Sequence, residues 1–219
     1  MWSTGPARRA REAGGRRALR PGFDLRPGMR VGLLGGSFNP AHEGHAHIAR
    51  TALGRLGLDK VIWLVSPQNP LKSAKGTASL AARMESARAF ATGPGMIVSD
   101  LEARLGSRYT IDLIRILRAR YPSVRFVWLM GADNLASFHR WRGWDQIMRL
   151  VPVCVVARPG WGLQGRLAPA ARRFAFARRP VSAAPRLAAM RPPAWIYLPA
   201  PLNFESSTAI RARARGEPH

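Results

Sequence analysis

Short apolar stretches recur along the chain and are separated by longer segments in which apolar residues follow a helical spacing. The stretches are three to seven residues long, and most are apolar throughout, which is typical of strands buried in a parallel sheet. Strands are expected at Arg30–Leu34, Lys60–Val65, Met96–Val98, Val124–Met130, Val151–Val156 and Trp195–Leu198.

Helices are predicted between these strands. In the first of them, Ile48, Ala52 and Leu56 fall on one face. Helices are expected at Glu43–Leu56, Ser79–Ala91, Thr110–Arg120 and Asp145–Leu150, and a C-terminal helix is expected to open at Ser207. The alternation of strand and helix predicts an α/β fold, a Rossmann-like open parallel sheet with helices on both faces in a single domain.

Two segments depart from this pattern. Residues 1–28 contain seven arginines, two acids and no periodic apolar pattern, so they are predicted to be a flexible basic tail ahead of a catalytic domain at 29–219. Residues 161–193 are rich in Pro, Arg and Ala and have no acids. An irregular, exposed excursion is expected there.

Composition narrows the function classes. The net charge is +23 and 32 of the 35 basic residues are arginines, spread along the chain without an aromatic RNA-binding signature, so nucleic acid is not expected as a partner. No apolar run approaches the roughly 18 residues of a membrane span, and the N-terminus has no apolar core of a secretory signal. The single cysteine, Cys154, excludes an intramolecular disulfide framework, and a cytoplasmic location is expected.

The junction after the first strand carries the candidate chemistry. Gly35 and Gly36 would let the backbone approach a ligand and adopt angles that other residues avoid. His42 and His45 stand three residues apart where a helix begins, and a helix N-terminus favours phosphate. A metal site that includes His47, a dinucleotide-binding loop and a plain structural turn are the alternatives. Spacing disfavours the metal site, and Gly-x-Gly-x-x-Gly is absent.

Two motifs resemble the signatures of the HxGH nucleotidyltransferase superfamily. Gly35–His45 resembles the first signature, with His42-Glu-Gly-His45 as the HxGH itself. Ser206–Arg211, Ser-Ser-Thr-Ala-Ile-Arg, resembles the SSTxIR motif that holds the ATP phosphates. The likeness covers residues 30–215.

Within that superfamily the chain resembles the bacterial nicotinate-nucleotide adenylyltransferases. Four further stretches carry this likeness: Ser66–Lys72, Arg108–Asp112, Gly131–Asp133 with the following Trp141, and Arg158–Gly160. The chain departs from the family at Leu71, where many members have His, at Leu113, where Thr is usual, and at Asn39, where Asp is common.

The resemblance implies roles for individual residues. His42 and His45 would be catalytic. The ATP-binding residues would be Gly35, Gly36, Ser37, Phe38, His42, His45, Gly131, Asp133, Ser206, Ser207, Thr208 and Arg211. The nicotinate mononucleotide-binding residues would be Lys72, Tyr109, Thr110, Asp112, Trp141 and Arg158. Mg²⁺ would arrive with ATP, and no protein side chain is assigned as its ligand.

Some of these residues also have structural explanations. Trp141 could be core packing, Asp133 could cap a helix, and Lys72 and Arg158 could be solvated surface charges.

The expected activity is transfer of the adenylyl group of ATP to nicotinate mononucleotide, which gives nicotinate adenine dinucleotide and pyrophosphate. One alternative is another acceptor, such as nicotinamide mononucleotide, phosphopantetheine or the precursor of a CDP-alcohol. A protein similar to a class I aminoacyl-tRNA synthetase would need a KMSKS-like loop and an RNA-binding domain, and neither is visible in the sequence. The alternative from a different functional class is a non-catalytic RNA-binding module. The sequence leaves homo-oligomer formation open.

Overall fold

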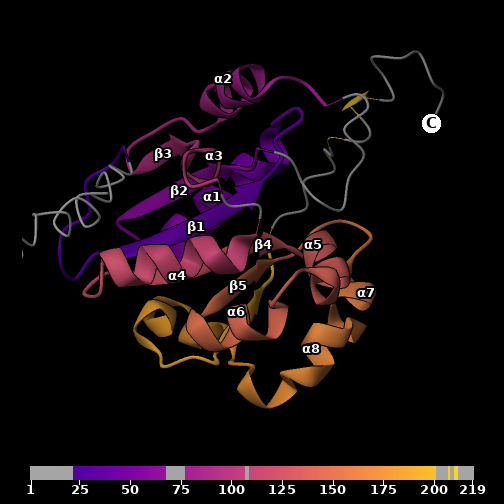
Figure 1. Cartoon of the computed structure of the whole chain (residues 1–219). Helices are drawn as coiled ribbons and strands as arrows, with labels where there is room; N and C mark the ends of the chain where they lie inside the picture. Colours follow the sequence, from indigo (N-terminus) through magenta and orange to yellow (C-terminus); the bar gives the residue numbers. More distant parts are fainter. Residues whose placement is uncertain (1–21, 68–76, 107–108, 201–206, 208–209, 212–219) are drawn as a thin grey trace, which may run out of the picture.

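A six-stranded, fully parallel sheet forms the centre of the molecule (Figure 1). The computed structural model describes residues 22–67, 77–106, 109–200, 207 and 210–211. The strands are β1 Arg30–Gly36, β2 Lys60–Val65, β3 Met96–Ser99, β4 Arg125–Gly131, β5 Val153–Val156 and β6 Trp195–Leu198. All six predicted strands are confirmed, with ends that differ by at most two residues.

The strand order is β3-β2-β1-β4-β5-β6, so the chain builds one half of the sheet outward from β1 and then returns to the centre at β4. β1 and β4 are hydrogen-bonded neighbours, and the winding direction reverses between them. In open parallel sheets a ligand crevice forms at such a reversal, beyond the carboxyl ends of the strands. The topology therefore places a binding site beyond Gly36 and Gly131.

Helices cover both faces of this sheet. They are α1 Glu43–Arg55, α2 Leu80–Phe90, α3 Leu101–Arg104, α4 Thr110–Arg120, α5 Ala132–Ser137, α6 Trp144–Leu150, α7 Gly162–Leu167 and α8 Pro169–Arg173, with 3₁₀ turns η1 Phe138–Arg140, η2 Ala175–Ala177 and η3 Val181–Ala189. The four internal helices predicted from periodicity are confirmed as α1, α2, α4 and α6. Ser207, Ile210 and Arg211 are helical, and the rest of the expected C-terminal helix lies outside the described residues. None of the described helices has the length and apolar character needed to cross a membrane.

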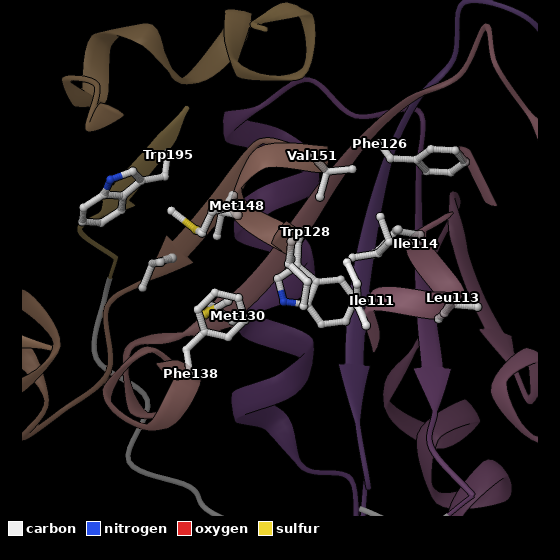
Figure 2. Close-up of a cluster of buried hydrophobic side chains, with 14 of the residues drawn as sticks. Ile111, Leu113, Ile114, Phe126, Trp128, Met130, Phe138, Met148, Val151 and Trp195 are labelled. Carbon is white, nitrogen blue, oxygen red and sulfur yellow. The ribbon is translucent and has the colours of Figure 1, made fainter. Parts of the chain in front are cut away.

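Side chains of the central strands divide between two cores. Trp128 and Met130 of β4 pack with α4, α6 and α8 on one face, whereas Val127 and Leu129 pack with α1, α2 and η3 on the other. This follows from the period of two along a strand. Figure 2 shows the fully buried Trp128 among its neighbours, with Ile111 of α4 on one side and Met130 on the other. The predicted α/β architecture, with helices on both faces, is confirmed.

The expectation of an irregular, exposed excursion at 161–193 is wrong. This segment forms α7, α8, η2 and η3, and buried side chains recur within it at intervals of three or four residues. The buried set is Ala168, Ala170, Ala171, Phe174, Ala177, Ala183, Ala184, Leu187 and Ala188. Most of these are alanines, whose small side chains let short helices approach the sheet closely.

The predicted flexible tail falls mostly on residues 1–21, outside the described residues, but its last part is ordered against the domain. Leu25 is 6 % exposed and belongs to the core, and Phe23 packs beside it. The Tyr121 hydroxyl donates to the Phe23 carbonyl at 3.4 Å, and the Gly28 N–H donates to the Ser123 carbonyl at 2.8 Å. The domain boundary predicted at residue 28 is therefore too late. Leu25 packs in the core, but it stands between the charged residues Asp24 and Arg26, so no apolar run marks it in the sequence.

Candidate active site

His42 and His45 lie at the first turn of α1, just beyond the carboxyl end of β1. His42 is the N-cap residue, and its Nδ1 accepts the Gly44 N–H at 3.1 Å. The His45 Nδ1 in turn accepts the His42 N–H at 3.3 Å. This reciprocal arrangement is a capping box in which imidazoles replace the usual hydroxyl and carboxylate. The ring centroids are 3.9 Å apart, so the two imidazoles form one pair.

These hydrogen bonds fix which ring nitrogen can donate. Because both Nδ1 atoms accept backbone N–H groups, the proton of each neutral ring is assigned to Nε2. Burial, assisted by the nearby positive charge of Arg158, lowers the pKa of His42 to about 4. His42 is therefore neutral at pH 7 and presents an Nε2–H donor.

Phe38 supports the histidine pair from the protein interior. Its side chain is 1 % exposed and packs against His45, with ring centroids 4.9 Å apart, and against Trp63 at 5.3 Å. Its backbone has φ +47°, in the left-handed region that is uncommon for residues other than glycine. Burial of the ring holds this conformation, so the phenyl group of Phe38 orients His45.

Gly35 and Gly36 have a packing role that differs from the expectation. Neither residue has positive φ, and both lie within β1, so the expected unusual backbone angles are absent. A Cβ on Gly35 would lie 2.5 Å from the indole ring of Trp128, and one on Gly36 would lie 3.1 Å from the ring of Phe38. The two glycines make room for aromatic rings behind the loop.

Just beyond the ends of β4 and β5, Asp133 and Arg158 lie next to each other, and Arg158 lies near His42. Arg158 is 8 % exposed, which excludes a solvated surface charge, and its Nε lies 3.8 Å from the Asp133 Oδ1. A Cβ on Gly44 would lie 2.5 Å from the Arg158 Nη1, so only glycine admits the guanidinium this close to the start of α1. Asp133 makes no side-chain cap to α5, and its buried Oδ1 accepts no hydrogen bond from the described residues.

The second motif lies against the first. The Ser207 hydroxyl donates to the Pro40 carbonyl at 2.9 Å, and the Arg211 guanidinium donates to the Asn39 carbonyl. These contacts join segments 167 and 172 residues apart in the sequence. Ser206 and Thr208 lie outside the described residues.

Part of the predicted acceptor set packs on the face of the sheet opposite to α1, in the core that contains Trp128. Tyr109 and Thr110 begin α4, and the Arg142 guanidinium stacks over the Tyr109 ring at 4.5 Å. Trp141 meets Trp128 edge to face at 6.1 Å, and Trp128 fills the space left by Gly35. Trp141 is half-buried, so it packs against the core and also leaves part of its ring exposed.

Some predicted residues are not brought to the site. Asp112 forms an ion pair with Arg115 of its own helix at 3.5 Å, and no described contact joins it to the other site residues. Lys72 lies outside the described residues. In the described part of the chain, no three His, Cys, Asp or Glu side chains are grouped closely enough to hold a metal, so the alternative that used His47 gains no support.

Sequence reasoning missed the side chains that hold the loop between β1 and α1. Arg83 of α2 is buried and donates to four carbonyls, and the Ser86 hydroxyl accepts the Ala41 N–H at 3.0 Å. The Asn39 Oδ1 accepts the Ala78 N–H at 3.1 Å, a role that its amide oxygen fills in place of a carboxylate. No short motif marks Arg83, because its partners come from distant segments.

A doubly wound parallel sheet with an imidazole-capped helix and a buried arginine at its point of reversal defines a nucleotide-handling α/β protein. The sequence profile of the cytidylyltransferase-like family matches residues 33–213. A Caulobacter protein named "Probable nicotinate-nucleotide adenylyltransferase" is 69 % identical over 185 residues, which cover 84 % of this chain and 98 % of the relative. A Cereibacter sphaeroides protein of the same name is 60 % identical over 187 residues, 85 % of this chain and 99 % of the relative.

Solved structures agree at the level of the fold. The nicotinic acid mononucleotide adenylyltransferase of Plasmodium falciparum complexed with NaAD superimposes with a TM-score of 0.60 at 14 % identity, over 84 % of this chain and 82 % of that one. The chain thus belongs to the cytidylyltransferase-like family and, within it, to the nicotinate-nucleotide adenylyltransferases.

Proposed function

We propose that this chain transfers the adenylyl group of ATP to nicotinate mononucleotide and so forms nicotinate adenine dinucleotide and pyrophosphate. The observation that carries the proposal is the imidazole pair of His42 and His45 at the start of α1, beside the buried Arg158. Helix N–H groups, two ring donors and a guanidinium together suit a polyphosphate. The curated relatives bear the name of this activity.

The reaction is an in-line displacement at phosphorus. An oxygen of the mononucleotide 5′-phosphate attacks the α-phosphorus of ATP, a new P–O bond forms, and the bond to the bridging oxygen of the β-phosphate breaks as pyrophosphate leaves. A phosphate oxyanion is already nucleophilic, so the protein needs no covalent intermediate. Its residues align two polyanions and stabilise the charge that develops in the transition state.

The histidines would donate to the phosphate oxygens that gain charge. The neutral His42 suits this role because its Nε2–H can donate while its unprotonated Nδ1 accepts the Gly44 N–H. Ser207 and Arg211 line the same loop and would hold the β- and γ-phosphates with Thr208. On the acceptor side, Tyr109, Thr110 and Trp141 would hold the nicotinate mononucleotide with Lys72 and Arg158.

Magnesium would reach the site with ATP. Mg²⁺ prefers oxygen ligands and is commonly held by substrate phosphates with one or two carboxylates. Asp133 suits such a role, because its Oδ1 is buried without a hydrogen bond from the described residues. When bound, the ion neutralises phosphate charge and polarises the α-phosphate. A cytoplasmic location and homo-oligomer formation stay predictions from the sequence.

A pyrophosphate-release assay tests the function. ATP is supplied with nicotinate mononucleotide, nicotinamide mononucleotide or 4′-phosphopantetheine in parallel, and the first acceptor is expected to give the highest kcat/KM. Preference for another acceptor would contradict the proposed substrate. Absence of release with all three, together with salt-sensitive RNA binding that survives loss of both histidines, would favour the RNA-binding alternative.

Substitution of His45→Ala tests the mechanism. Loss of one donor to developing charge typically reduces turnover by about 10²–10³-fold, so kcat is expected to fall at least that far. Circular dichroism and thermal unfolding check that the variant is folded. Near-normal turnover in a folded variant would exclude the role given to His45.

A further inference from the structure

Arg83 is a buried arginine whose described partners are all backbone carbonyls. Its side chain is 2 % exposed, and fully buried arginines are rare unless their hydrogen bonds are satisfied. Nη1 donates to Ser37 at 2.8 Å and to Ser66 at 2.6 Å, Nη2 donates to Pro67 at 2.7 Å, and Nε donates to Ala78 at 3.0 Å. One guanidinium therefore satisfies four acceptors.

These carbonyls belong to the two loops that leave neighbouring strands. Residues 37–42, here called the phosphate loop, connect β1 to the histidine pair, and Ser37 lies at its start. The segment that follows β2 is here called the acceptor loop; its described ends are residues 66–67 and 77–78, and Ser66 and Pro67 begin it. The Ser66 N–H also donates to the Gly36 carbonyl at 3.0 Å, which keeps the two loops side by side.

Two further contacts support the same loop, one from Ala78 just before the N-cap of α2 and one from α2 itself. The Ala78 N–H donates to the Asn39 Oδ1, and the Ser86 hydroxyl accepts from the Ala41 N–H. Together with Arg83, these residues hold the phosphate loop at three points along its length. Between these points lies Phe38, with its positive φ and with its ring against His45. A change at Arg83 would thus be transmitted to the imidazole pair through Phe38.

We propose that Arg83 is a positioning residue for adenylyl transfer: its planar fork aligns the phosphate loop with the acceptor loop, so that both substrates meet in reactive geometry. The inference rests on the proposed function. Lysine cannot replace this fork, because a single ammonium directs its donors from one point, whereas the guanidinium spreads five N–H groups over a plane.

The test compares Arg83→Lys and Arg83→Met with Arg88→Met, an exposed arginine of the same helix. Arg83→Lys is expected to lower kcat by roughly 10–100-fold and to raise KM for ATP and for nicotinate mononucleotide together, because small misplacements of reacting groups have effects of this size. Arg88→Met is expected to keep all three parameters within about twofold. If Arg83→Lys is folded and keeps all three within about twofold, the inference is overturned.

Chemical rescue separates positioning from a general loss of folding. In Arg83→Ala, added guanidinium at sub-denaturing concentration is expected to restore part of the rate, whereas sodium chloride at equal ionic strength is not. Equal responses to the two salts would contradict the proposal. If Arg83→Met or Arg83→Ala does not fold, the kinetic comparison with Arg83→Lys decides.

A measurement without turnover keeps this inference distinct from the proposed function. If the unaltered chain releases no pyrophosphate with nicotinate mononucleotide, the proposed substrate fails, and the role of Arg83 is then judged by the imidazole NMR signals. The His45 ring signals are expected to move in folded Arg83→Lys and not in Arg88→Met. Unchanged His45 signals would overturn the positioning role.

Discussion

At the scale of single residues, His42 combines two tasks that usually fall to different side chains. Its Nδ1 caps α1, and its Nε2–H is the donor that the proposed function assigns to a phosphate oxygen. The cap requires an unprotonated Nδ1, so the burial that keeps the ring neutral also keeps the helix start intact. The helix cap and the proposed phosphate contact therefore depend on the same protonation state.

A pH prediction follows from the lowered pKa of His42. The pKa in the folded chain is about 4, below the ordinary histidine value of 6.5, so the unfolded chain binds this proton first as the pH falls. The stability from neutral His42 is complete above about pH 6.5 and is progressively lost towards pH 4, by on the order of 3 kcal/mol. Replacement by His42→Asn keeps a good N-cap and removes this loss.

The measurement is urea unfolding of both proteins between pH 4.5 and 7.5. Burial raises the pKa of Glu102 to about 7, which gives the opposite pH dependence of stability in the same window. Both proteins contain Glu102, so the difference between their free energies of unfolding isolates the contribution of His42. His42→Asn is expected to gain stability relative to the parent as the pH falls, and to lose activity at every pH. A difference that does not vary with pH would contradict the lowered pKa.

The role of a site residue could be predicted from the sequence where its partners lie close to it along the chain. The histidine pair and the helix that they cap are close in sequence, so spacing alone places both rings together. Arg83 could not be found in this way, because its four acceptors come from the ends of two strands and from the residue before its own helix cap. Nothing in the local pattern distinguishes it from Arg88.

At the scale of elements, β1 requires glycine at position 35 because the side chain of Trp128 from the neighbouring strand occupies the adjacent space. Substitution by Gly35→Ala would bring a methyl group within 2.5 Å of the fully buried Trp128, and overpacking of this kind typically costs about 1–3 kcal/mol. Gly54→Ala, at a site with no atom within 4 Å in the last turn of α1, is expected to stabilise by about 0.5–1 kcal/mol. Urea unfolding of both variants checks the contrast, and equal effects would argue against the packing role.

Strands and helices in which large apolar residues recur regularly could be predicted from the sequence. The short helices that bury mainly alanine side chains could not. The strands and the long helices have runs of large apolar residues, which burial requires. The segment at 161–193 buries mainly the methyl groups of alanines, and exposed arginines stand between them in the sequence. Short helices of this kind are stabilised by contact with the sheet, so their periodicity is visible only once the sheet is in place.

At the scale of the whole molecule, the N-terminal boundary of the domain affects its stability. Burial of a leucine side chain is worth about 1.5–3 kcal/mol, and Leu25 is buried against the core. A chain that begins at Gly22 is expected to be more stable than one that begins at Met29 by about that amount. Thermal unfolding of the two chains makes the comparison, with Leu25→Ala in the longer one as a single-residue equivalent. Equal midpoints would contradict the corrected boundary.

The contact of Ser207 and Arg211 with Pro40 and Asn39 also has a consequence for synthesis. The ribosome synthesises the chain from its N-terminus, so the loop that carries the histidines is made early. Ser207 and Arg211, which contact this loop, are made more than 160 residues later. A nascent chain can pair β1 with β2 long before it can close the nucleotide site. If the proposed ATP site is the one that Ser207 and Arg211 complete, only chains whose translation has passed β6 can bind ATP.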